Sequence, residues 1–237
     1  MKRKVHYAGW SAPVAHVTRR PRYGARVLTL SQIRGPLAAR KPETISDETL
    51  LRAAVALILR EGREGLDMFF IERSRREDDP WSGHMAFPGG RLEDGDTGTR
   101  AAAERETLEE VGIPLAEAEY LGRLTDLQGS PRFRQNRLVV TAHMYHSDFS
   151  GPPVLDPIEV SSAMWFPVER LSDPSTHVAH RTSEAGTMEF PGIEVGEPGR
   201  HVVWGLTYRF LEIFMEAVGR PLPERSIVGS PPKSWVS

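Results

Sequence analysis

Two long runs of apolar residues mark the first predicted elements of the chain. Residues 52–60 are apolar at every position between two flanking arginines, which is typical of a buried strand. Residues 66–73 form a second, mostly apolar run, and the five residues between the runs include two glycines. The pattern therefore predicts a β-hairpin with a five-residue connection at residues 61–65.

The clearest helical signal lies at residues 99–111, which are rich in Ala, Glu and Arg. Gly112 follows directly, and glycine readily takes the left-handed conformation that ends many helices. A closing helix is predicted over residues 204–218, because their apolar positions recur at helical spacing. Everything from residue 221 onward is predicted to be a tail.

The remaining segments alternate between strand and loop character. Residues 120–127 and 138–145 are predicted strands joined by a polar loop, whereas residues 160–168 have a mixed pattern. Residues 181–200 are rich in Gly, Pro and Glu, which predicts an irregular connection or a short hairpin. Strands combined with one central and one C-terminal helix indicate an α/β (α+β) fold in layers, within a single domain.

Composition limits the class of protein further. The 237 residues are 39% hydrophobic and 26% charged, which is typical of a globular protein. No stretch approaches the roughly 20 apolar residues that span a bilayer, so we expect no membrane association. The absence of cysteine excludes disulfides, thiolate metal sites and a cysteine nucleophile.

Charge is distributed unevenly along the chain. Residues 1–42 contain ten Lys or Arg and no Asp or Glu, whereas the remainder has 20 basic and 32 acidic residues. Such a segment could be a transit peptide, an arm that binds nucleic acid, or a basic face that packs on the acidic body. Packing is favoured by the apolar residues it also contains: Val27, Leu28, Leu30, Ile33 and Leu37. Because it lacks the apolar core of a secretory signal, we expect a cytoplasmic protein, or a mitochondrial one in a eukaryote.

The segment that carries chemistry is residues 89–113. At 100° per residue, Glu106, Glu109 and Glu110 fall within about 100° of arc on one face of the predicted helix, opposite Leu108. Like charges at this spacing destabilise a solvated helix, and a divalent cation would remove the repulsion. Carboxylate oxygens suit Mg²⁺ or Mn²⁺, and Mg²⁺ often also contacts substrate phosphates. The face predicts either a metal site for a phosphate compound or a solvated acidic surface.

A glycine turn precedes this helix by about ten residues. Gly89 and Gly90 follow Pro88, and glycine lets backbone groups approach an ion or a phosphate oxygen with no side chain in the way. The turn and the acidic face together favour a catalytic site.

Residues 90–113 resemble the signature of the Nudix hydrolase family, in which Gly, five residues, Glu and seven residues precede Arg-Glu-(apolar)-x-Glu-Glu-x-Gly-(apolar). Residues 105–113, RETLEEVGI, match the second half, with Thr107 in the first apolar slot. In the first half Asp96 replaces the glutamate, and eight residues separate it from Arg105. Glu93 is an alternative to Asp96 for the supporting contact with the helix that the glutamate makes in the family. The one-residue expansion is similar to the coenzyme A pyrophosphatase branch of the family.

The resemblance implies a Nudix-type α/β/α sandwich with a mixed sheet at residues 43–220. A basic segment at residues 1–42 and a tail at residues 221–237 flank this domain. It also implies a hydrolase that requires Mg²⁺ or Mn²⁺ and cleaves a nucleoside diphosphate linked to another moiety.

Roles for individual residues follow from the same resemblance. Glu106, Glu109 and Glu110 would be metal ligands, Gly90 would contribute its carbonyl, and Arg105 would orient a helix carboxylate. Water activated by the metal would then attack a diphosphate phosphorus in line.

The general base has two candidates in the sequence. Glu106 is one, and Glu159 resembles the downstream acidic residue that many relatives bring to the site, although a solvated loop glutamate is its alternative. Five further residues are expected to contact substrate: Arg73, Trp81, Gly89, Arg132 and Arg134. Arginine suits phosphate because its guanidinium can bind two oxygens at once, although an arginine in a polar loop can also be plain surface. A tryptophan can stack on a base, although Trp81 can also serve in packing.

Substrate class is predicted from the extended resemblance. Residues 69–74, Gly83 and residues 87–90 resemble a motif of coenzyme A pyrophosphatases, and residues 204–207 resemble their C-terminal segment. Asp79, however, stands about where that motif carries a basic residue, and a negative charge there would repel the coenzyme's extra phosphate.

Three outcomes therefore stay open. The best match is hydrolysis of coenzyme A or acyl-coenzyme A, and the first alternative is hydrolysis of NADH, ADP-ribose, a nucleotide sugar or a dinucleoside polyphosphate. The second alternative is a Nudix-fold module that binds nucleic acid through its basic arm, which is not favoured because a pure binder has no need of three mutually repelling carboxylates. Assembly as a homodimer is also open.

Overall fold

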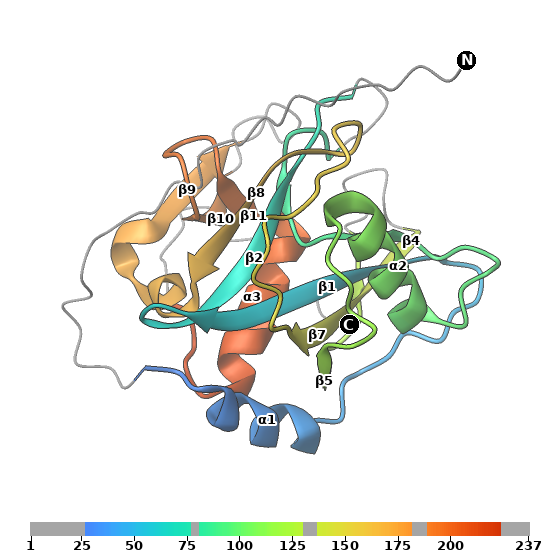
Figure 1. The fold of residues 1–237 in the computed structure, drawn as a ribbon, viewed down its shortest axis with the longest axis horizontal. Helices are drawn as coiled ribbons and strands as arrows, with labels where there is room; N and C mark the ends of the chain where they lie inside the picture. Colours follow the sequence, from blue (N-terminus) through green and yellow to red (C-terminus); the bar gives the residue numbers. More distant parts are fainter. Residues whose placement is uncertain (1–26, 77–80, 130–136, 182–188, 224–237) are drawn as a thin grey trace, which may run out of the picture.

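The computed structural model describes residues 27–76, 81–129, 137–181 and 189–223. A mixed sheet in the order β3-β2-β1-β7-β5 forms the centre of the molecule, with β4 paired to β1, β6 to β7 and β8 to β2 (Figure 1). Its strands are β1 (Leu51–Gly62), β2 (Gly65–Arg73), β3 (Met85–Ala86), β4 (Gly89–Arg91), β5 (Glu119–Arg123), β6 (Leu127–Gln128), β7 (Leu138–His146) and β8 (Val160–Pro167).

The two central strands, β1 and β7, run parallel over nine paired positions, from Leu51 opposite Leu138 to Leu59 opposite His146. The predicted hairpin of β1 and β2 is present, but its connection is shorter than the five residues expected. Gly62 pairs with Gly65, so two residues form the turn. The extended pairing continues past the apolar run because backbone hydrogen bonds, rather than apolar side chains, define where a strand ends.

Alternation along β1 divides the core into two layers. Ala54, Ala56 and Ile58 pack in one apolar cluster with the helix α2 (Thr99–Val111). Leu57 and Leu59 belong to the other cluster, which includes the helices α1 (Leu30–Ala39) and α3 (Gly205–Ala217). Figure 1 shows α3 passing behind β1, with α1 at the bottom of the view. The predicted α/β architecture with helices on both sides of a mixed sheet is thus confirmed.

The basic N-terminal segment contributes a helix that the sequence pattern did not predict. Leu30, Ile33 and Leu37 of α1 are buried together with Leu28, whereas Val27 stays 46% exposed. The part of this segment that the structure describes therefore packs on the body through four of its five apolar residues. Residues 1–26, on which the nucleic-acid-binding alternative depends, lie outside the described residues.

A second sheet of three strands, β9 (His177–Arg181), β10 (Glu189–Glu194) and β11 (Val202–Trp204), precedes α3. Within the region predicted as irregular or as a short hairpin, Arg181 and residues 189–194 belong to this sheet. The predicted strand at residues 120–127 is divided into β5 and β6, and the pairing of β5 with β7 shifts register between Tyr120 and Gly122. The mixed pattern at residues 160–168 forms β8. None of the described helices has the length and apolarity needed to cross a membrane.

Candidate metal and catalytic site

The helix α2 carries the acidic residues and ends where the sequence predicts. Gly112 has φ 68°, and its N–H donates to the Leu108 carbonyl at 3.0 Å. The buried side of α2 differs from the one suggested by apolarity, because Leu108 is 54% exposed and Thr107 is fully buried. The hydroxyl of Thr107 donates to the Ala103 carbonyl at 2.7 Å, which satisfies this buried polar group within the helix.

The glycine turn lies directly against β1. Gly89 pairs with Val55 and has φ 146°, and a Cβ atom at this position would lie 2.2 Å from the Ala54 carbonyl oxygen. A Cβ atom on Gly90 would lie 2.4 Å from the Glu106 carboxylate. Close approach of the turn to the β1 backbone therefore requires Gly89, whereas a side chain at position 90 would displace the Glu106 carboxylate.

Glu110 is the buried member of the acidic face. One carboxylate oxygen, Oε2, accepts a hydrogen bond from the Gly89 N–H at 2.8 Å, whereas Oε1 is buried with no hydrogen-bond partner among the described residues. Burial raises the pKa of Glu110 to about 8, and the negative charges of Glu106 and Glu159 add to this effect. A buried carboxylate oxygen that makes no hydrogen bond costs free energy, which a bound cation would recover.

Three carboxylates converge at this point. Ligand oxygens of Glu106, Glu110 and Glu159 all lie within 4.8 Å of one another. Burial is the main cause that raises the pKa of Glu106, and the charge of Glu159 acts in the same direction. Three oxygens at this spacing match the hard, oxygen-rich ligand set that Mg²⁺ and Mn²⁺ prefer, so the residues fit the cation that the sequence implies.

Glu159 reaches the group because the chain before β8 caps the end of α2. The Val154 N–H donates to the Val111 carbonyl and the Asp156 N–H to the Glu110 carbonyl, both at 2.9 Å. Sequence reasoning did not identify these capping positions, because the hydrogen bonds come from backbone groups and leave no residue signature.

Arg105 is held by several acceptors beside the carboxylate group. Its Nε and Nη2 atoms lie 3.1 and 2.9 Å from the two oxygens of Asp96, and its Nη1 atom lies 3.0 Å from Glu106. Glu93 is 4.0 Å away. The sequence left open whether Asp96 or Glu93 supports the helix. Asp96, despite its shorter side chain, is the residue that makes this contact, through Arg105.

Glu109 is not brought into the group. Its side chain is 59% exposed, and its carboxylate accepts a hydrogen bond from Arg105 Nη1 at 3.1 Å. Helical spacing placed all three glutamates on one face, but the sheet covers only the side of α2 that carries Glu110. A metal-binding role for Glu109 stays a prediction.

The residues expected to contact substrate have different positions. Arg73, at the end of β2, has its Nη1 atom 3.8 Å from Glu110 Oε1, so it lies beside the carboxylate group. Trp81 is partly buried against the core, which agrees with the packing alternative. Arg132, Arg134 and Asp79 lie outside the described residues.

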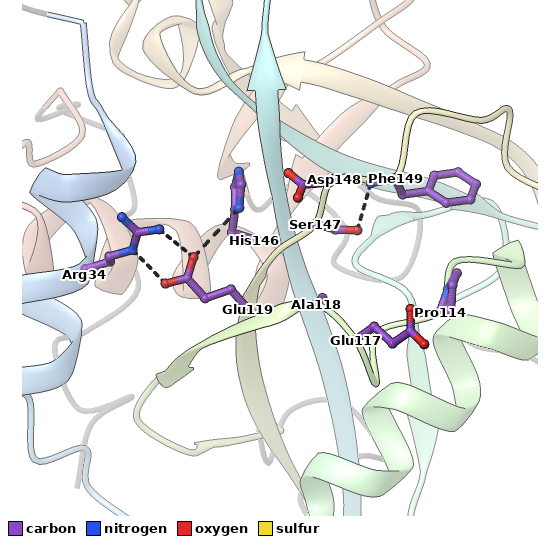
Figure 2. A pocket seen from close by; sticks show the side chains of 9 residues that line it. All are labelled: Arg34, Pro114, Glu117, Ala118, Glu119, His146, Ser147, Asp148 and Phe149. Carbon is purple, nitrogen blue, oxygen red and sulfur yellow. Dashed lines mark hydrogen bonds and ion pairs between the residues drawn. The ribbon is translucent and has the colours of Figure 1, made fainter.

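A separate pocket of about 590 Å³ lies beside α1, between β5 and the end of β7. Figure 2 shows Arg34 of α1 pointing toward Glu119, with His146 on the other side of that carboxylate. None of the three converging carboxylates lines this pocket, so it is distinct from the candidate metal site.

Comparison with known proteins gives a family match and several relatives. Residues 49–185, which are more than half of the chain, match the family model of the NUDIX domain. A stretch of 129 residues is 34% identical to an uncharacterized protein of Schizosaccharomyces pombe and covers 52% of this chain and 39% of that protein. A second stretch, of 105 residues, is 39% identical to an uncharacterized Nudix hydrolase named NudL from Escherichia coli O7:K1. This match covers 42% of this chain and 51% of that protein.

Among solved structures, the MutT NUDIX hydrolase from Burkholderia pseudomallei is 26% identical, with a TM-score of 0.41, and the match covers 52% of this chain and 88% of that one. The chain spans about half the length of the curated relatives it matches.

Proposed function

This chain belongs to the NUDIX domain family, and from this premise we propose that it is a metal-dependent hydrolase of a diphosphate linkage. The observation that carries the proposal is the convergence of Glu106, Glu110 and Glu159 within 4.8 Å, with one buried oxygen of Glu110 that receives no hydrogen bond from the described residues. A solvated acidic helix would not bury a carboxylate in this way.

We assign cation binding to Glu106, Glu110 and Glu159, with the Gly90 carbonyl and Glu109 as further ligands taken from the family signature. The Gly89 N–H fixes the orientation of Glu110, and Arg105 holds Glu106. A bound divalent cation would lower the pKa of water and neutralise charge on the phosphate oxygens.

Glu159 is the better candidate for the general base. The carboxylate of Glu106 already accepts a hydrogen bond from Arg105 at 3.0 Å, whereas the described residues give no hydrogen bond to the carboxylate of Glu159. One oxygen of Glu159 would bind the cation, and the other could accept the proton of an attacking water within hydrogen-bond reach. Arg73, which lies next to Glu110, would bind a phosphate oxygen of the substrate.

We propose that the substrate is a nucleoside diphosphate linked to another moiety. The resemblance of residues 69–74, 83 and 87–90 to the coenzyme A pyrophosphatase motif supports coenzyme A or acyl-coenzyme A. The acidic residue at position 79 supports a substrate without the 3′-phosphate, because like charges repel.

A hydrolysis screen tests the proposal. The full chain is incubated with coenzyme A, dephospho-coenzyme A, NADH, ADP-ribose, a nucleotide sugar and a dinucleoside polyphosphate, each with Mg²⁺, with Mn²⁺ or with a chelator. We expect metal-dependent cleavage of at least one diphosphate linkage, with ¹⁸O from water in one phosphate product. Absence of cleavage with either metal would contradict the proposed activity.

A further inference from the structure

An ion pair between a buried glutamate and a half-exposed arginine lies immediately beside the candidate site. Glu72 of β2 directly precedes Arg73 and is 4% exposed. Arg200, in the connection between β10 and β11, donates to both of its oxygens, from Nε at 3.0 Å and from Nη2 at 2.8 Å. Ser162 of β8 donates to the same carboxylate at 2.8 Å. The carboxylate of Glu72 thus links the connection between β10 and β11 to strands β2 and β8 of the central sheet.

Glu72 is ionised in this environment. Burial alone would raise its pKa, but the hydrogen bonds from Arg200 and Ser162 outweigh burial and hold the pKa at about 2. Its carboxylate is therefore negative at neutral pH, and Arg200 supplies the opposite charge. Removal of Arg200 leaves the buried charge of Glu72 without this partner, which disturbs the surrounding structure.

The ion pair is located where the pairing of β2 with β8 is irregular. The register shifts between Glu72 and Arg73. On one side of this shift the Ser161 hydroxyl donates to the Glu72 carbonyl at 3.1 Å, and on the other the Ser74 N–H donates to the Glu159 carbonyl at 2.8 Å. The bonds to Glu72 therefore hold the point from which Arg73 and Glu159 reach the site.

A second contact reaches the same place. The ring of Trp204, in β11, packs edge-on against His84 with centroids 4.8 Å apart. The His84 carbonyl in turn accepts a hydrogen bond from the Arg73 N–H at 3.0 Å. Arg200 and Trp204 thus each contact a residue next to Arg73: Glu72 precedes it in the sequence, and His84 is hydrogen-bonded to its backbone.

We propose that Arg200 is a positioning residue of the candidate site: by binding Glu72, it keeps Arg73 and Glu159 in place around Glu110. The inference rests on the proposed function, because it assigns to Arg200 a role in that reaction. Arg200 acts through Glu72 and is not itself a catalytic residue. The register shift between Glu72 and Arg73 makes the β2–β8 ladder irregular at this point, so the side-chain bonds to Glu72 add to the backbone bonds that hold the two strand ends.

Hydrogen exchange of the full chain tests the proposal without metal or substrate. Arg200→Met removes the charge but keeps most of the side-chain stem, and Arg181→Met is the matched control. Arg181 pairs with Glu189 within the same second sheet, at 2.5 Å, and is 71% exposed. We expect exchange of the Arg73 and Ser74 amides to become at least about tenfold faster in Arg200→Met and to stay unchanged in Arg181→Met. Arg200→Lys, which keeps the charge, should fall between wild type and Arg200→Met.

Unchanged exchange at Arg73 and Ser74, or an equal increase throughout the protein, would overturn the proposal, because the first means no coupling and the second means general destabilisation. If Arg200→Met does not fold, the double variant Glu72→Gln, Arg200→Met carries the same test, since it leaves no unpaired buried charge.

Two further measurements connect the positioning to the site. Calorimetry with Mn²⁺ alone should give about fivefold weaker binding to Arg200→Met, because Glu159 is one of the three converging carboxylates. With a substrate identified in the screen, we expect a higher KM from displaced Arg73 and a lower kcat from displaced Glu159, at temperatures where the variant stays folded. A wild type that hydrolyses nothing would contradict the proposed function, while the exchange pattern would still decide the role of Arg200.

Discussion

Arg105 donates two hydrogen bonds to the carboxylate of Asp96, from Nε to Oδ1 at 3.1 Å and from Nη2 to Oδ2 at 2.9 Å. The same guanidinium reaches Glu106 with its remaining nitrogen. Asp96 thereby fixes the arginine that orients one of the three converging carboxylates. Its pKa is lowered by the hydrogen bonds from Arg105, so it is ionised over the whole physiological range.

Asp96→Asn should lower turnover about tenfold, because loss of a charged partner that orients a ligand typically costs ten- to a hundredfold. Glu93→Gln should stay within about twofold of wild type, since Glu93 lies 4.0 Å from Arg105 and is 68% exposed. Steady-state kinetics on the substrate from the screen compares the two variants. A larger loss in Glu93→Gln would reverse the assignment.

Glu110→Gln should lower turnover at least about a hundredfold and abolish stabilisation by Mn²⁺, because it removes a charge at the cation and changes little volume. The same loss of turnover is predicted for Glu109→Gln, although that carboxylate must leave Arg105 to reach the cation. Kinetics and thermal melts with and without Mn²⁺ measure both effects. Glu117→Gln, an exposed glutamate at the separate pocket, is the control, and wild-type turnover in Glu110→Gln would exclude it as a ligand.

Gly89→Ala should destabilise the fold by at least about 3 kcal/mol, because the new methyl group combines an unfavourable φ with a clash against the β1 backbone. Gly95→Ala should change the free energy of unfolding by less than about 0.5 kcal/mol, since nothing lies within 4 Å of its added Cβ. Chemical denaturation measures both. Equal stability of the two variants would show that the turn can move away from β1.

Ile33→Ala should lower the free energy of unfolding by about 3 kcal/mol, which is typical of truncating a fully buried aliphatic residue. Val27→Ala, at a half-exposed position of the same segment, should lower the free energy of unfolding by less than about 1 kcal/mol. Denaturation curves compare the two variants. If Ile33→Ala proves as stable as wild type, α1 does not belong to the core in solution.

His143 predicts a loss of stability in acid. Burial lowers its pKa to about 4, and its two ring nitrogens bond Thr99 and Tyr120 at 3.0 Å each. Between pH 6.5 and 4 the unfolded chain binds a proton that the folded protein does not, so stability falls as the pH falls through this window. The loss is about 3 kcal/mol, since one pKa unit corresponds to 1.36 kcal/mol.

Urea denaturation at several pH values measures the effect of His143. His143→Gln is expected to flatten the dependence between pH 6.5 and 4 relative to wild type, whatever its stability at neutral pH. Parallel curves for the two proteins would mean that other groups cause the acid sensitivity.

Much of the fold was predictable because its signals are local. The spacing of residues 99–111 and the glycine after them define α2 at both ends, as the structure confirms. The apolar runs predicted β1 and β2, although the turn between them is shorter because backbone pairing continues through Gly62. The helix α1 was missed, because its ten residues contain an internal proline and glycine and owe their stability to burial against the sheet.

The sequence by itself determined the family and the acidic face of α2, since helical periodicity places Glu106, Glu109 and Glu110 within one arc. Only the tertiary structure decided which carboxylates meet. Backbone hydrogen bonds from the chain before β8 cap α2 and bring Glu159 to Glu106 and Glu110. Arg105 keeps Glu109 at the surface. Periodicity fixes directions around a single helix, whereas the distance between residues of different elements depends on how those elements pack.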